Sequence, residues 1–262
     1  MASELASRQV FPVSTLLLVI WAGSAALTAV SCQSMAAMGG VPMPGGWTMS
    51  MTWMRMPGQT WPGAAASFLG MWLVMMVAMM LPAIGPMLLR YQRTVASTTR
   101  PRLDLLSRVG AGYFFVWGLF GLVAFPLGIA LAEIEMRVPA VSRAVPAAGG
   151  VVVLAAGALQ FTAWKARHLA CCRGEHEHGL ALAADAGTAW QHGLRLGLDC
   201  CRCCGSLMVI PLVCGVMDIS AMAVVTIAVT VERLAPDGER AARRVGVAVV
   251  GAGLVLIARA AA

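Results

Sequence analysis

The stretch from Ser67 to Leu89 reads SFLGMWLVMMVAMMLPAIGPMLL and contains no charged side chain. An apolar α-helix of roughly 20 residues crosses about 30 Å of hydrocarbon. Similar runs recur along the 262 residues, of which 59% are hydrophobic and only 12% charged. A water-soluble domain of this size could not cover its surface with so few polar residues. The sequence therefore predicts an all-α protein, a polytopic membrane helix bundle with about six transmembrane helices.

The predicted spans form a single integral membrane domain over residues 1–262. A signal peptide is the alternative for the first run, but that run exceeds the roughly 7–15 apolar residues of a signal sequence, which favours a span. The spans cover residues 12–30, 67–89, 109–131, 146–165, 205–231 and 245–258.

Most basic residues fall in short connections between the apolar runs, so the net charge of +7 indicates membrane orientation rather than nucleic-acid binding. With six spans, the Arg-rich connections 90–108 and 165–202 lie on one side together with both termini. We expect this side to be the cytoplasm. A further connection, residues 232–244, argues against this orientation, since its arginines would then face outward.

Four cysteines occupy five positions in Cys200-Cys201-Arg202-Cys203-Cys204. On a helix, positions 200, 203 and 204 share one face, and positions 168 and 172 share another. Thiolate and imidazole ligands favour Cu(I), zinc or iron–sulfur centres. Free cysteine is otherwise a small buried apolar residue, which is the interpretation preferred for Cys32 and Cys214. The sequence predicts one metal site where spans four and five end and begin, formed by His168, Cys172, Cys200, Cys203 and Cys204.

Methionine is concentrated in the outer loop 32–62 and in the span that follows it. Thioether sulfur suits Cu(I), but methionine also fills packing gaps, and both interpretations stay open. An acid within a span is a functional candidate, although Asp218 could equally pair with Gln160 or Thr162 of span four. The segment His176-Glu177-His178 is interpreted as a solvated surface stretch. The candidate accessory or path residues are Met49, Met51, Met54, Met56, Met75, Met79, Met217 and Asp218.

The chain resembles a bacterial family of predicted metal-binding integral membrane proteins. The resemblance covers about Pro42 to Pro236 and implies metal binding and an inner-membrane location. At position 168 the family pattern has cysteine, where this chain has histidine. The matching motifs are MWLVMMVAMMLP from Met71 to Pro82, LQFT from Leu159 to Thr162 with Lys165, Cys172-Arg173, GLDCCRCC from Gly197 to Cys204, GVMD from Gly215 to Asp218, and Glu232-Arg233.

We therefore expect an inner-membrane protein that binds copper as Cu(I), with zinc as the alternative metal, and that transports it, delivers it or serves metalloenzyme assembly. Its expected partners are the metal ion, the lipid bilayer and a soluble metallochaperone-like or client protein. No catalytic motif stands out, so an enzyme is the less favoured interpretation. The alternatives are a membrane thiol–disulfide oxidoreductase and an anchor for a soluble partner.

Overall fold

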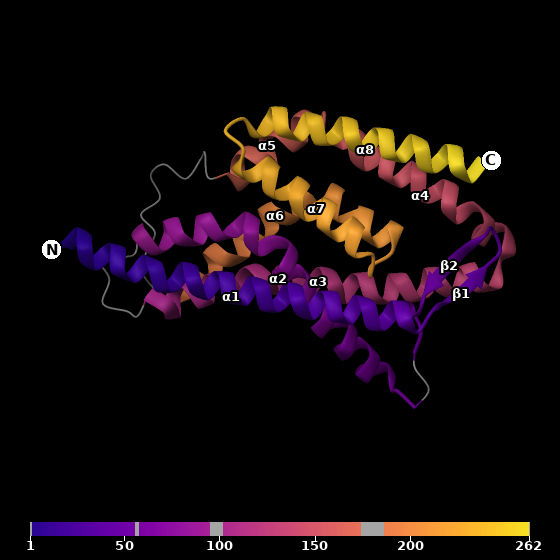
Figure 1. Ribbon diagram of the computed structural model, residues 1–262, viewed down its shortest axis with the longest axis horizontal. Coiled ribbons are helices and arrows are strands. Elements are labelled where there is room, and N and C mark those ends of the chain that lie inside the picture. Colours follow the sequence, from indigo (N-terminus) through magenta and orange to yellow (C-terminus); the bar gives the residue numbers. More distant parts are fainter. Residues whose placement is uncertain (1, 56–57, 95–101, 174–185, 262) are drawn as a thin grey trace.

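The computed structural model describes residues 2–55, 58–94, 102–173 and 186–261. Over these residues it is helical apart from a short hairpin and its flanking turns (Figure 1). The helices are α1 (Ala2–Ala37), α2 (Trp61–Thr94), α3 (Arg102–Arg137), α4 (Pro139–Leu159), α5 (Ala163–Cys172), α6 (Ala186–Cys214), α7 (Ile219–Leu234) and α8 (Gly238–Ala261).

Six of these helices are long and apolar enough to cross a membrane. This confirms the predicted fold class, an all-α membrane helix bundle. The six candidate spans are Val13–Ala37, Trp61–Gln92, Leu103–Arg137, Pro139–Leu159, Ala186–Cys214 and Gly238–Ala261.

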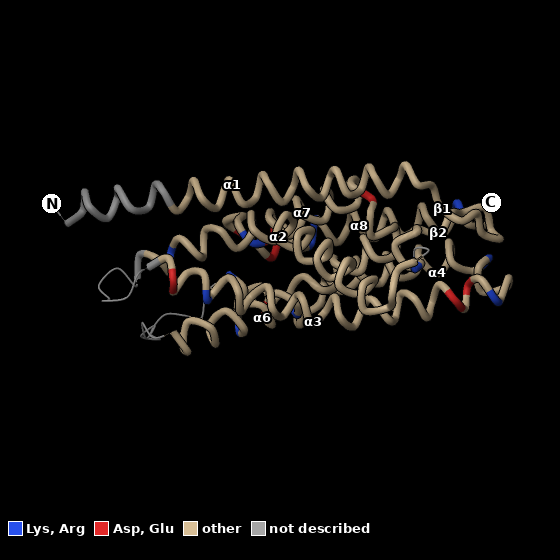
Figure 2. Tube along the Cα trace, turned by 90° about the horizontal axis from the view of Figure 1, so that it is seen from below, with Lys and Arg blue, Asp and Glu red and all other residues tan. Residues whose placement is uncertain are grey.

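The helices run along the long axis of the molecule and pack in pairs, α1 with α2, α3 with α6, and α4 with α8 (Figures 1 and 2). Small residues let the helix backbones approach closely. A Cβ added at Gly197 of α6 would lie 2.9 Å from the backbone oxygen of Tyr113 in α3. A Cβ added at Gly157 of α4 would lie 2.7 Å from the backbone nitrogen of Val250 in α8. These glycines therefore fix how near the paired helices lie.

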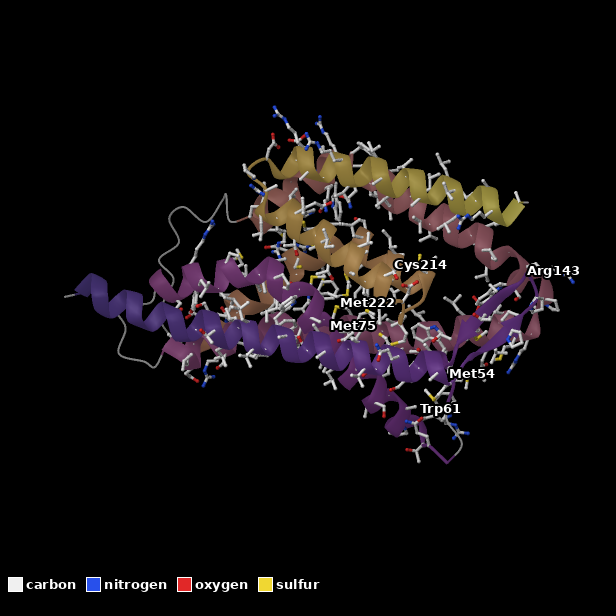
Figure 3. The ribbon with its side chains drawn as sticks, viewed as in Figure 1. Met54, Trp61, Met75, Arg143, Cys214 and Met222 are labelled. Carbon is white, nitrogen blue, oxygen red and sulfur yellow. The ribbon has the colours of Figure 1, made fainter. Side chains whose placement is uncertain are left out.

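The outer loop contains an antiparallel hairpin, β1 (Gly40–Met43) and β2 (Trp47–Ser50), followed by the short 3-10 helix η1 (Met51–Trp53). The Trp47 indole donates to the backbone oxygen of Ser142 at 2.9 Å, which attaches the hairpin to α4. Figure 3 places Arg143, the next residue of α4, at the hairpin end of the molecule.

The predicted fifth span, residues 205–231, is not one helix. The helix α6 begins at Ala186 and ends at Cys214, and α7 begins at Ile219. Gly215 has φ +126°, a conformation that favours glycine, and the Asp218 side chain caps α7 by accepting from Ala221 N at 3.0 Å. These two local signals end one helix and start the next. The cysteine run consequently lies in the interior of α6 rather than at the mouth of a span.

The predicted fourth span, residues 146–165, is also divided. The helix α4 ends at Leu159, and the Thr162 hydroxyl caps α5 by accepting from Lys165 N at 3.2 Å. Lys165 and Cys172 therefore belong to α5, a separate short helix.

The helix α7 runs back along part of the bundle (Figure 1), and its 16 residues are not among the six candidate spans. The two termini lie at opposite ends of the long axis, whereas the six-span topology had placed them on one side. Arg90 of α2, Arg173 after α5 and Pro236 between α7 and α8 line one cavity, so these three connections share an end. The arginine-rich connection 232–244 thus lies at the same end of the bundle as the other basic connections. Its arginines therefore no longer argue against placing all the basic connections on one side.

Candidate metal centre

The helix α6 carries Cys200, Cys203 and Cys204 on one face, and all three are fully buried. Cys201 points partly away and is half-buried. The Sγ atoms of Cys200 and Cys204 lie 3.8 Å apart. The Cys203 side chain interacts with those of Cys204 and of Cys172, which comes from α5. Two helices thus bring four thiols into one continuous row.

His168 is placed differently from the other four predicted ligands. Its ring is half-buried and lies edge-on against Trp164, with 4.6 Å between the ring centroids. No contact found among the described residues links this imidazole to the thiol row. The structure therefore brings together four of the five predicted ligands.

The thiols form a row rather than a closed shell. Over residues 2–55, 58–94, 102–173 and 186–261, no group of three or more His, Cys, Asp or Glu side chains is arranged to hold a metal ion. The donor chemistry of the row is nevertheless soft throughout, because every side chain in it is a thiol. Thiolates of this kind select Cu(I) over hard cations. Cys172, Cys200, Cys203 and Cys204 are the residues that would hold it, after loss of their thiol protons.

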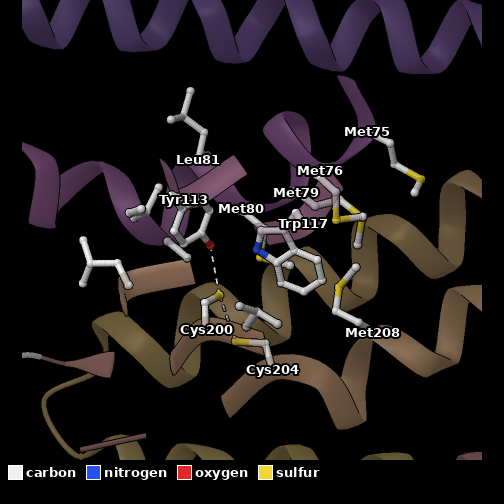
Figure 4. Close-up of a cluster of buried hydrophobic side chains, with 14 of the residues drawn as sticks. Met75, Met76, Met79, Met80, Leu81, Tyr113, Trp117, Cys200, Cys204 and Met208 are labelled. Atoms are coloured by element: carbon white, nitrogen blue, oxygen red, sulfur yellow. Dashed lines mark hydrogen bonds between the residues drawn. The ribbon is translucent and has the colours of Figure 1, made fainter. Parts of the chain in front are cut away.

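Two polar side chains from other helices contact the thiol of Cys200. The Tyr113 hydroxyl of α3 donates to its Sγ at 2.9 Å, as the dashed line in Figure 4 shows. The Arg233 guanidinium of α7 lies 3.7 Å from the same Sγ and donates to the backbone oxygen of Cys172 at 3.4 Å. The Cys200 sulfur therefore lies between a hydroxyl of α3 and a guanidinium of α7.

Arg233 is 6% exposed. Within the part of the chain that the structure describes, no carboxylate forms an ion pair with it. A buried cation without an anionic partner is unfavourable. Thiolates in the adjacent row would supply the missing negative charge.

A buried ion pair joins the three helices around Cys203. Lys165 Nζ lies 2.6 Å from Glu232 Oε2, and the two side chains are 1% and 0% exposed. The same Nζ donates to the backbone oxygen of Cys203 at 2.7 Å. Lys165 thereby links α5, α6 and α7 at the level of the thiol row.

Methionines surround the other side of the thiols. Met75, Met76, Met79 and Met80 of α2 and Met208 of α6 are all buried in the same cluster as Cys200 and Cys204, and Figure 4 shows Met75 at the far side of it from the two thiols. The interior next to the thiols is therefore rich in sulfur, with tight packing that also fits a structural role for these methionines.

The remaining accessory candidates are scattered. Met217 accepts from the thiol of Cys32 at 3.7 Å. Asp218 lies at the turn before α7, where it serves as the helix cap, rather than in the middle of a span. Met49 belongs to the hairpin and is buried with Ala132 of α3, and Met51 and Met54 line a cavity nearby. Met56 and the segment His176-Glu177-His178 lie outside the described residues.

Sequence reasoning did not assign Tyr113, Lys165, Glu232 and Arg233 to the site. Arg233 was interpreted as a charge that sets membrane orientation, and Lys165 as the end of a span. A signal was present, because ionisable residues that face the interior of a membrane bundle are rare and mark functional positions. For Glu232 and Arg233, burial follows from the return of α7 after the helix break at Gly215, which the sequence pattern did not reveal.

The thiol row is reached from one end of the bundle. A cavity of about 230 Å³ is lined by Cys172, Arg233, Arg90, Arg173 and Pro236, among others. Cys172 is therefore the thiol closest to this opening, while Cys200, Cys203 and Cys204 have no exposed surface.

Comparison with known protein families places the chain in one of them. The model of a copper chaperone family, PpoB2, matches residues 69–256. This range contains all four thiols of the row, together with Tyr113, Lys165, Glu232 and Arg233. No curated protein and no solved structure matches the chain.

Proposed function

Because the chain belongs to this copper chaperone family, we propose that it binds Cu(I) within the membrane through the thiol row and passes it on, by transport, by delivery or in metalloenzyme assembly. The observation that carries the proposal is the row itself. Cys172, Cys200, Cys203 and Cys204 come together from two helices, with the Arg233 guanidinium beside them. A donor set made only of thiols suits Cu(I), whereas many zinc sites also include imidazole or carboxylate ligands.

The buried position of the row supports retention of the ion. Excluding water from the thiols slows oxidation and release of a bound Cu(I) ion, and the cavity beside Cys172 supplies a path for exchange with a client protein. The methionines of α2 extend the soft interior away from the row and would relay the ion along the bundle.

We further propose that the protein resides in a bacterial inner membrane with the arginine-rich end in the cytoplasm. Basic residues next to membrane spans favour the cytoplasmic side. The connections after α2, α5 and α7 share that end, and the N-terminus lies at it as well. The hairpin and the C-terminus would then lie on the outer face.

Burial argues against the alternative of thiol–disulfide exchange. That reaction requires a thiolate to attack an accessible sulfur through a mixed disulfide. Cys200, Cys203 and Cys204 are each 0% exposed, so a protein partner would have to open the bundle first.

The test is the amount of Cu(I) retained by purified protein under anaerobic, reducing conditions. We expect the Cys200→Ser/Cys203→Ser/Cys204→Ser variant to lose its tightly bound Cu(I), because the row loses three of its four sulfurs. The matched control is Cys171→Ser/Cys214→Ser, which changes two exposed cysteines and should retain copper as the wild type does. Equal copper content in the triple variant and the wild type would refute the thiol site.

A further inference from the structure

A second sulfur-lined space lies at the opposite end of the bundle from the arginine-rich connections. It is a cavity of about 140 Å³, located where α1 ends, η1 forms and α2 begins. Figure 3 places Met54 and Trp61 together at this end. Four of its lining residues are methionines, from α1, η1, the residue after η1, and α2: Met35, Met51, Met54 and Met71.

These four methionines differ from those that pack the core. Each is half-buried and borders the cavity. Met75 and Met76, one turn further along α2, are instead 2% and 0% exposed. Gap-filling methionine is expected in the second environment, but it does not explain thioethers gathered around an open space.

The cavity offers thioether sulfurs, and its lining oxygens belong to the neutral side chains of Thr52, Gln59 and Ser67. Among its described lining residues there is no Cys, His, Asp or Glu. Its charged lining side chain, Arg55, is held at the rim, where its guanidinium lies 5.4 Å from the centroid of the Trp61 ring and donates to the backbone oxygen of Gln59. Neutral thioethers bind Cu(I) and are poor ligands for zinc, calcium or magnesium.

Sulfur atoms continue inward from this cavity along two helices. On α2, Met71, Met75 and Met79 follow one another at intervals of one helical turn, toward the methionines beside the thiol row. On α1, Cys32 lies one turn before Met35, and its thiol contacts the Met217 sulfur at 3.7 Å. The cavity therefore stands at the outer end of a sulfur-rich interior.

We propose that Met35, Met51, Met54 and Met71 form a second Cu(I) site, an exchangeable thioether site at the hairpin end of the bundle. The inference rests on the proposed function, since it assumes that the protein handles Cu(I). Because thioethers carry no proton, Cu(I) binding at this site does not depend on pH in the range where thiols and imidazoles titrate.

The test uses the variant Met35→Leu/Met51→Leu/Met54→Leu/Met71→Leu, in which leucine keeps the side-chain volume close to that of methionine. The readout is Cu(I) bound per monomer, measured in competition with a chromophoric Cu(I) chelator. We expect the variant to bind one Cu(I) fewer than the wild type. The matched control is Met38→Leu/Met136→Leu, which changes two exposed methionines outside the cavity and should bind as the wild type does.

A second measurement separates this site from the thiol row. In the Cys200→Ser/Cys203→Ser/Cys204→Ser variant, we expect one weakly held Cu(I) to remain, with the same occupancy from about pH 5 to about pH 8. Its removal by the single change Met54→Leu would confirm the site even if the quadruple variant does not fold. If the methionine variants retain all Cu(I), this proposal is wrong and the thiol site is unaffected. If the methionine variants lose Cu(I) and the cysteine variant loses none, the thiol site is wrong instead.

Discussion

Arg233 is the residue whose replacement most directly tests the electrostatics of the thiol row. Its guanidinium lies 3.7 Å from the Cys200 sulfur and is buried. At an effective dielectric constant near 20, unit charges at that separation attract each other by about 4 kcal/mol. Since about 1.4 kcal/mol corresponds to a tenfold change in affinity, full loss of this attraction would weaken Cu(I) binding about a thousandfold.

We expect Arg233→Gln to weaken Cu(I) binding by about a hundredfold to a thousandfold, because Cu(I) binds thiolates and the variant removes the adjacent positive charge. The range allows for relaxation of the neighbouring side chains. Arg233→Lys keeps the charge and should lie much closer to the wild type. The assay is competition with a chromophoric Cu(I) chelator under anaerobic conditions.

The control for this experiment is Arg90→Gln. Arg90 lines the same cavity but is exposed at the end of α2, so water screens its charge and the affinity should change little. If Arg233→Gln bound Cu(I) as tightly as the wild type, the guanidinium would not stabilise the thiolates and the electrostatic reasoning would be wrong.

Three further changes test the packing around the site. Gly197→Ala should lower the free energy of unfolding by about 1–3 kcal/mol in detergent, because the added Cβ meets α3 at 2.9 Å, whereas Gly205→Ala, with nothing within 4 Å, should be neutral or stabilising. Lys165→Met should destabilise by about 3–5 kcal/mol by leaving Glu232 buried and unpaired, and adding Glu232→Leu should restore most of that loss in the same unfolding assay. Asp218→Ala should lower the free energy of unfolding by about 1 kcal/mol through loss of the helix cap, and should leave the Cu(I) content unchanged. Loss of copper in elemental analysis would show instead that Asp218 takes part in Cu(I) binding.

The sequence pattern predicted the class of fold because apolar length and helical period are local properties. The run around Met71 is long enough to cross a membrane, and the structure has a helix there. The common face of Cys200, Cys203 and Cys204 follows from helical spacing alone, and the structure buries all three. The divided fifth span was missed because hydropathy stays high through Gly215, while one glycine conformation and one cap decide the break.

The sequence by itself thus determined a helical membrane bundle with three cysteines on one helix face, since both features depend on residues close together in the chain. Only the tertiary structure decided which distant groups complete the row. Cys172 rather than His168 reaches Cys203, and Arg233 turns toward Cys200, because the rotation of α5 and the return of α7 place them there. Such contacts depend on how whole helices pack against one another, which no local pattern encodes.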